Sequence, residues 1–183
     1  MSGLPLGEAG GTAGTTTAAT RSRAHWLVFV GVAVTVMILD QLAKAWLVAN
    51  VSPGEVVNVL GDYVRLIFSQ NSGALFGLFA QNAVLFGIAS LVVVGLIIGY
   101  HAKAGRSLYL SIALGLLLGG ALGNLIDRLR LGYVIDFVDM GLGSLRFYTF
   151  NLADAAISTA IVMLIGAALF PALVGWRERR SDG

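Results

Sequence analysis

Four long apolar runs constrain this chain more than any other feature of its sequence. They cover residues 26–50, 82–100, 108–126 and 152–173, and a helix of about 20 apolar residues can cross the ~30 Å hydrocarbon core of a bilayer. The composition agrees, because 57% of the 183 residues are hydrophobic and only 12% are charged. The sequence therefore predicts an α-helical integral membrane protein with four transmembrane helices.

Positive charges lie at the ends of the apolar runs and not in one basic stripe, and the formal net charge is only +2. This distribution argues against a nucleic-acid partner. One side of the predicted bundle carries seven Lys or Arg residues: Arg21, Arg23, Lys103, Arg106, Arg177, Arg179 and Arg180. The other side carries four: Arg65, Arg128, Arg130 and Arg146. Since the side richer in Lys and Arg faces the cytoplasm, we expect both termini there.

The two ends of the chain flank one expected membrane domain at about residues 25–175. Residues 1–24 are mostly Gly, Thr, Ala and Ser and lack hydrophobic bulk, which predicts a disordered cytoplasmic tail. Residues 176–183 are rich in Arg and form a basic cytoplasmic tail.

The first apolar run has a competing interpretation as a secretory signal peptide, since Arg21 and Arg23 precede it as a charged n-region would. We favour a functional helix. Asp40 and Lys44 lie four residues apart within the run, so they share one helix face. The pair serves either as a structural ion pair between helices or as part of a site, and the spacing does not separate these two roles.

One segment outside the apolar runs predicts β-structure. Residues 55–70 alternate apolar and other residues around Gly61-Asp62, which predicts a short hairpin. This hairpin cannot span a bilayer, so it should lie at the outer surface. In the third run, Gly115, Gly119 and Gly123 recur at every fourth residue, a spacing that allows close helix packing in membranes.

The chain has no Cys, which excludes disulfides, thiolate metal sites and thiol nucleophiles. Its only imidazoles, His25 and His101, fall on the same cytoplasmic side of the predicted topology. This argues against a metal site or a catalytic triad built on His, and we expect neither a metal nor a cofactor.

Four of the ten acidic residues lie between or just inside the last two apolar runs: Asp127, Asp136, Asp139 and Asp154. Carboxylates near a membrane are costly and indicate a functional site. Asp154 has a structural alternative, because it follows a plausible N-cap, Asn151, in the first turn of a helix. Asp127 has one too, as a salt-bridged neighbour of Arg128. Asp136 is flanked by apolar residues, so desolvation should raise its pKa.

Two carboxylates in different environments can share acid and base roles. We expect a protonated Asp136 to hydrogen-bond a substrate carbonyl, while an ionised Asp154 takes a proton from water. The two side chains should then lie close enough to share one proton.

The motifs together resemble the lipoprotein signal peptidase family, also called type II signal peptidases. They are Asp40-x-x-x-Lys44, Asn71-Ser72-Gly73-Ala74-x-Phe76-Gly77, Gly123-Asn124-x-x-Asp127-Arg128, Val134-Ile135-Asp136-Phe137 and Phe150-Asn151-Leu152-Ala153-Asp154. The resemblance runs from about residue 26 to residue 173. It implies a monomeric four-helix aspartyl endopeptidase of the bacterial inner membrane, with its active site near the outer face. It also implies a small extracytoplasmic β-sheet, with β segments at about residues 55–70 and 133–150. Such an enzyme removes the signal peptide of a prolipoprotein by cutting before a cysteine that carries diacylglycerol, so its partners are that substrate and membrane lipid.

The resemblance also implies roles for individual residues. Asp136 and Asp154 are the expected catalytic pair. The expected substrate-binding residues are Asn71, Gly73, Asn124, Arg128 and Asn151, and the expected supporting residues are Asp40, Lys44, Asp127 and Ala153. Leu75 departs from the family pattern, where Ala is more usual.

The main alternative is a small proton- or ion-coupled transporter, because such proteins also place single carboxylates in short helical bundles. Asp40 would then be the coupling group. The long outer segments and the position of the other carboxylates, at the helix ends and not at mid-membrane, favour the peptidase.

Overall fold

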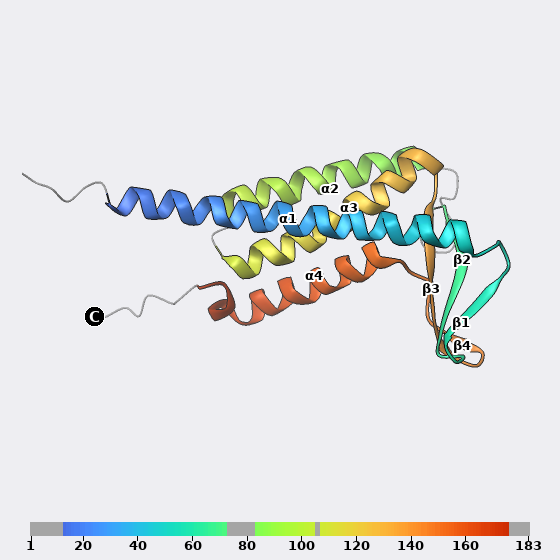
Figure 1. Cartoon of the computed structure of the whole chain (residues 1–183). Helices are drawn as coiled ribbons and strands as arrows, with labels where there is room; N and C mark the ends of the chain where they lie inside the picture. Colours follow the sequence, from blue (N-terminus) through green and yellow to red (C-terminus); the bar gives the residue numbers. More distant parts are fainter. Residues whose placement is uncertain (1–12, 73–82, 105–106, 176–183) are drawn as a thin grey trace, which may run out of the picture.

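The computed structural model describes residues 13–72, 83–104 and 107–175, which form a helical bundle with a small sheet across one end (Figure 1). The helices are α1 (Ala13–Asn50), α2 (Ala83–Ala104), α3 (Leu108–Leu131), α4 (Leu152–Leu169) and the short 3-10 helix η2 (Pro171–Val174). The strands are β1 (Val56–Leu60), β2 (Val64–Asn71), β3 (Val134–Leu142) and β4 (Leu145–Arg146).

The central element of the bundle is α3, which packs against α1, α2 and α4. Its glycines permit this. A Cβ atom on Gly119 would lie 2.6 Å from the carbonyl oxygen of Ala33 in α1, and one on Gly120 would lie 2.5 Å from that of Ala153 in α4. Side chains cannot occupy those positions, so the close helix packing predicted from the glycine spacing is confirmed.

Three helical segments within the described residues are long and apolar enough to cross a membrane: Ser22–Asn50, Leu108–Leu131 and Leu152–Leu169. The described apolar part of α2, Gly87–Lys103, is shorter. The structure therefore supports three of the four predicted spans by length and composition. Their outer faces are apolar, as lipid contact requires: the side chains of Leu27 and Val162 are 75% and 69% exposed.

The ends of two helices differ from the sequence prediction. α1 begins at Ala13, so the prediction of a disordered tail up to residue 24 is wrong for residues 13–24. Each residue that extends an existing helix gains a hydrogen bond without a new nucleation step, and this segment contains several Ala, the best helix former. α4 ends at Leu169 and not at residue 173, because Pro171 cannot continue an α-helix. The expected tails at residues 1–12 and 176–183 lie outside the described residues.

The sheet is antiparallel, with strand order β1-β2-β3-β4. The predicted hairpin is present, and Gly61 turns it with a positive φ of 53°. β3 follows α3 directly, because Gly132 ends the helix in the left-handed conformation (φ 81°). Ser69 of β2 pairs with Asp136 of β3. The short turn at Gly132 brings the first residues of β3 beside the end of α3. Asn151, the N-cap of α4, contacts the same part of β3 through Asp136.

A separate ion-pair cluster stabilises the far part of the sheet. Asp139 of β3 lies 2.6 Å from Arg65 of β2 and 2.9 Å from Arg146 of β4, measured between side-chain oxygen and nitrogen atoms. Desolvation alone would raise the pKa of Asp139. Hydrogen bonds from the two guanidinium groups outweigh it and hold that pKa below its ordinary value. Asp139 therefore connects three strands and is not part of the site below.

Candidate active site

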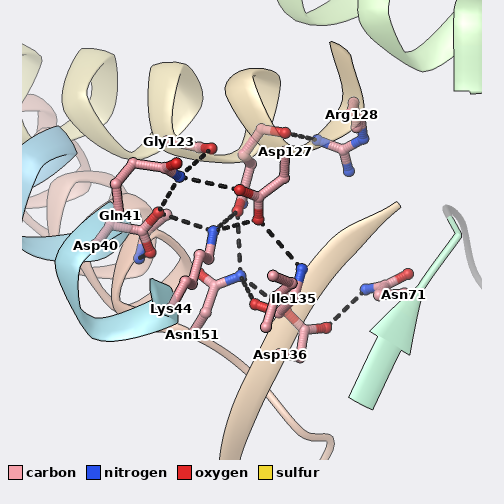
Figure 2. A network of polar contacts seen from close by, with 12 residues as sticks. Asp40, Gln41, Lys44, Asn71, Gly123, Asp127, Arg128, Ile135, Asp136 and Asn151 are labelled. Carbon is pink, nitrogen blue, oxygen red and sulfur yellow. Dashed lines mark hydrogen bonds and ion pairs between the residues drawn. The ribbon is translucent and has the colours of Figure 1, made fainter. Parts of the chain in front are cut away.

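A buried polar network lies where α1, α3 and α4 meet β3, at the sheet end of the bundle (Figure 2). It joins residues that are far apart in the sequence. The predicted site residues that the structure brings together here are Asp40, Lys44, Asn124, Asp127, Asp136, Asn151, Ala153 and Asp154. Figure 2 also shows Asn71 reaching this network from the end of β2.

Lys44 is the cation of the network. Its Nζ lies 2.8 Å from Asp40 Oδ2 and 2.7 Å from Asp127 Oδ2, and all three side chains are at most 3% exposed. The pairing of Asp40 with Lys44 on one face of α1 confirms the four-residue spacing argument. Asp127, for which the sequence offers a structural role as a salt-bridged neighbour of Arg128, pairs with Lys44 of another helix. Burial of these charges is tolerated because each has an opposite partner and further hydrogen bonds.

Gln41 of α1 also belongs to the network, although it is not among the site residues predicted from the sequence. Its Nε2 donates to Asp127 Oδ1 (2.9 Å) and to the carbonyl oxygen of Gly123 (3.1 Å), and it also approaches Asp40 Oδ2 at 3.3 Å. The amide therefore ties α1 to α3 and donates to both carboxylates that flank Lys44. The only signal for it in the sequence is its position beside Asp40.

Two Asn side chains connect the ion pairs to Asp136 and Asp154. Asn124 Oδ1 accepts hydrogen bonds from Lys44 Nζ (3.1 Å) and from Asn151 Nδ2 (3.1 Å). Asn124 Nδ2 donates to Asp154 Oδ1 (2.8 Å), and Asn151 Nδ2 donates to Asp136 Oδ1 (2.7 Å). The position of each of these two carboxylates is thus fixed by an amide that the Lys44 cluster orients.

Asp136 is buried, with 2% of its surface exposed. Its two oxygens accept hydrogen bonds from different elements. Oδ1 accepts from Asn151, the N-cap of α4, and Oδ2 accepts from Asn71 Nδ2 of β2 at 2.9 Å. Burial raises its pKa to about 6, and the charge of Asp154 acts in the same direction. The hydrogen bonds from Asn71 and Asn151 and the charge of Lys44 oppose the shift without cancelling it. The rise predicted from the apolar flanks is confirmed.

Asp154 lies in the first turn of α4, as predicted, and forms a capping box with Asn151. The side chain of Asn151 accepts from the Asp154 amide (2.9 Å), and Asp154 Oδ2 accepts from the Asn151 amide (3.2 Å). Asp40 Oδ1 also accepts from the backbone N–H of Ala153 at 3.0 Å. The turn that carries Asp154 is therefore fixed from α1 as well as from its own cap.

Arg128 and Gly73 are the two remaining predicted substrate residues. Arg128 lies on the last turns of α3, where its Nη1 is 3.4 Å from the carbonyl oxygen of Asn124. Its charge also interacts with Asp154, Asp136 and Asp127. Gly73 lies outside the described residues.

The chemistry that this arrangement allows is acid–base chemistry on two carboxylates. Asp136 and Asp154 come from different elements, have different hydrogen-bond partners and influence each other electrostatically. Such a pair can keep one proton between two groups. Among the residues that the structure describes, no group of three His, Asp or Glu side chains is placed to hold a metal ion. Asp40, the coupling group of the transporter alternative, is paired with Lys44.

Comparison with known proteins gives a consistent picture. Residues 32–170 match the family described as signal peptidase (SPase) II. The lipoprotein signal peptidase of Moorella thermoacetica is 40% identical over 151 residues, which cover 82% of this chain and 98% of that protein. The lipoprotein signal peptidase of Syntrophomonas wolfei is 39% identical over 153 residues, covering 84% and 98%. A solved structure of a bacterial membrane enzyme superposes with a TM-score of 0.73 at 27% identity, covering 84% of this chain and 94% of that one.

Proposed function

The chain belongs to the signal peptidase II family, whose peptidases remove signal peptides from prolipoproteins, and from this premise we propose that Asp136 and Asp154 are its catalytic pair. One observation carries the proposal. These two carboxylates are each held by an Asn amide at the junction of bundle and sheet, and one of them has its pKa raised to about 6. An aspartic peptidase needs such a pair, with one proton shared between two acids.

In the proposed mechanism the two carboxylates activate one water molecule between them. The positive end of the α4 macrodipole stabilises negative charge on Asp154, which accepts a proton from the water. Protonated Asp136 donates a hydrogen bond to the scissile carbonyl oxygen as the hydroxide adds to the carbonyl carbon. The tetrahedral intermediate then collapses, the C–N bond breaks, and the leaving amine takes the proton that Asp154 received. Asn124 and Asn151 keep both carboxylates oriented through these steps.

The substrate proposed for this site is a prolipoprotein whose cysteine carries diacylglycerol, cut immediately before that cysteine. A lipid-anchored peptide presents its scissile bond at the membrane interface, and the proposed pair lies at the helix ends beside the sheet (Figure 1). Asn71 contacts Asp136 from the end of β2, so this part of the sheet borders the place where the peptide binds. We assign Arg128 and Gly73 to substrate binding on the family motif alone.

The proposed topology has four spans, with α2 as the second, in a bacterial inner membrane. The first turns of α1 and the short helix η2 lie at the end of the bundle opposite the sheet (Figure 1). In the topology predicted from the sequence, seven Lys or Arg residues lie on the side of the termini and four on the other, which supports cytoplasmic termini and a site near the outer face. We further propose that the enzyme acts as a monomer, as the resemblance to the family implies.

The test is cleavage of a diacylated lipopeptide by detergent-purified protein carrying Asp136→Asn or Asp154→Asn. Each variant should insert and purify normally but lose at least about 100-fold in kcat, the usual scale of an acid–base contribution. Asp62→Asn is the matched control, because Asp62 lies in the hairpin turn with 58% of its side chain exposed. Substantial turnover in the Asp136→Asn protein removes that residue from the pair.

A further inference from the structure

A groove of about 1060 Å³ lies between α2 and α4, with α3 as its floor, on the half of the bundle away from the sheet. Both walls and the floor are apolar along most of its length, and its lining includes Leu96, Ile97, Leu110, Leu114, Leu117 and Leu164. α2 and α4 each pack on α3. The groove is therefore an opening on the lipid-facing side of the bundle and is separate from the polar network described above.

One end of this groove is polar. Lys103 from the last turn of α2, Tyr100 one helical turn earlier and Ser107 at the start of α3 line it there. Lys103 and Tyr100 are exposed, and among the residues that the structure describes no acidic one belongs to the groove lining. Ser107 is the N-cap residue of α3, but its side chain makes no capping hydrogen bond. A cation and two hydroxyls thus meet at the positive end of a helix macrodipole, beside an apolar channel.

We propose that this groove binds an anionic membrane phospholipid. Its phosphate lies against Lys103 and Ser107, and its acyl chains follow the apolar walls toward Leu114 and Leu117. Basic pockets between transmembrane helices recognise anionic head groups in this way. Charge-assisted hydrogen bonds to phosphate are stronger than those between neutral groups, and the first backbone N–H groups of α3 add to the attraction for an anion.

The charge at the groove mouth decides between a lipid and the other apolar occupant available to this enzyme, the signal peptide of its substrate. A signal peptide has an apolar central region that fits the walls, but a positively charged segment precedes that region. In this groove that segment would approach Lys103, and none of the described lining residues is acidic and able to balance the two charges. A phosphate group has the opposite sign and gains from the same contact.

The experiment compares phosphatidylglycerol with phosphatidylcholine, which carries no net charge, by native mass spectrometry and by titration of the full-length protein in detergent. The protein should retain phosphatidylglycerol in preference. Lys103→Gln should weaken that binding about five-fold, the effect of removing one basic residue near an anionic lipid. Lys103→Arg should restore it. Arg23→Gln is the matched control, because Arg23 is an exposed cation of α1 that does not line the groove.

Ala167 lines the groove, so Ala167→Phe should fill it and weaken both lipids, whereas millimolar inorganic phosphate should not displace the bound lipid. Equal retention of the two lipids, or an unchanged affinity in Lys103→Gln, overturns the proposal. It is also overturned if Ala167→Phe raises the KM for a prolipoprotein but leaves lipid binding unchanged, because the groove then holds the signal peptide. None of these readouts depends on which aspartates are catalytic.

Discussion

Replacement of Asp136 by Asn should abolish cleavage and at the same time stabilise the protein at neutral pH. The reason is the cost of a buried negative charge. Burial raises the pKa of Asp136 from 3.8 to about 6, so the folded state holds this proton more tightly than the unfolded state does. Wherever the folded state binds more protons, the free energy of unfolding falls as pH rises. The wild-type protein therefore loses stability between about pH 4 and pH 6, and the uncharged amide of the Asp136→Asn variant cannot contribute to that loss.

The size of the effect follows from the shift. A difference of roughly two pKa units corresponds to about 3 kcal/mol, at about 1.4 kcal/mol per unit. Asn also disturbs the hydrogen bonds from Asn71 and Asn151 to the two carboxylate oxygens, at a cost of about 1 kcal/mol that does not depend on pH. The net gain should be about 2 kcal/mol above pH 6. Near pH 4 the variant should be no more stable than the wild type.

The assay is unfolding in mixed detergent micelles at several pH values, with Asp139→Asn as the control. Asp139 lies three residues along the same strand, but Arg65 and Arg146 hold its pKa below the ordinary value. Its ionised form therefore contributes stability above its unfolded pKa, and that stability is lost as pH falls. Asp139→Asn should be less stable than wild type at neutral pH, with the gap closing in acid. Two variants with the same sign, or an Asp136→Asn difference independent of pH, would refute the reasoning.

Three further predictions concern the same network and the helix contacts around it. Lys44→Met should lower the free energy of unfolding by about 3–5 kcal/mol, because it leaves two buried carboxylates without their cation. Asp127→Asn should lower it less, by about 1.5–3 kcal/mol, because Asp40 and Lys44 remain as a balanced pair. Equal losses for the two variants in a denaturation assay would contradict this. Gly120→Ala should destabilise the protein, because its Cβ would lie 2.5 Å from the α4 backbone. Gly95→Ala, with nothing within 4 Å of the added Cβ, should instead stabilise it by about 0.5–1 kcal/mol. The pH profile of kcat/KM should fall on its basic side with a midpoint at about 6, because kcat/KM reports the free enzyme and Asp136 must be protonated to act. A flat profile from pH 5 to 8 would exclude Asp136 as the proton donor.

Features with a local cause could be predicted from the sequence. The apolar runs locate the helices, the alternation around Gly61 predicts the hairpin, and Asn151 is the N-cap of α4 as expected. The ion pair of Asp40 and Lys44 follows from their spacing on one helix. In each case the residues that interact lie within a few positions of each other, so chain geometry alone brings them together.

Features with a tertiary cause could not be predicted in this way. The sequence offers the neighbouring Arg128 as a partner for Asp127, but it gives no sign of the buried ion pair that Asp127 forms with Lys44 of α1. The partner depends on how α1 lies against α3, and spacing within one helix does not determine that. Gln41 and Asn124 illustrate the same limit, because each amide acts between groups from different helices. Their residue types carry no signal until the helices are in place.

The charge balance of the network links its structural role to the proposed chemistry. Four buried or partly buried acids belong to the network: Asp40 and Asp127 contact Lys44, whereas Asp136 and Asp154 are joined to it through Asn151 and Asn124. Two cations, Lys44 and Arg128, act on this group of acids. In a medium of low polarity such an excess of acids favours the uptake of a proton, and Asp136 is the acid on β3 whose pKa is raised. The charge of Lys44 opposes this rise, so the cation that joins α1 to α3 also limits how tightly the pair holds its proton. A neutral residue at position 44 should therefore move the basic side of the pH profile upward, whereas a cation with only a structural role would leave it in place.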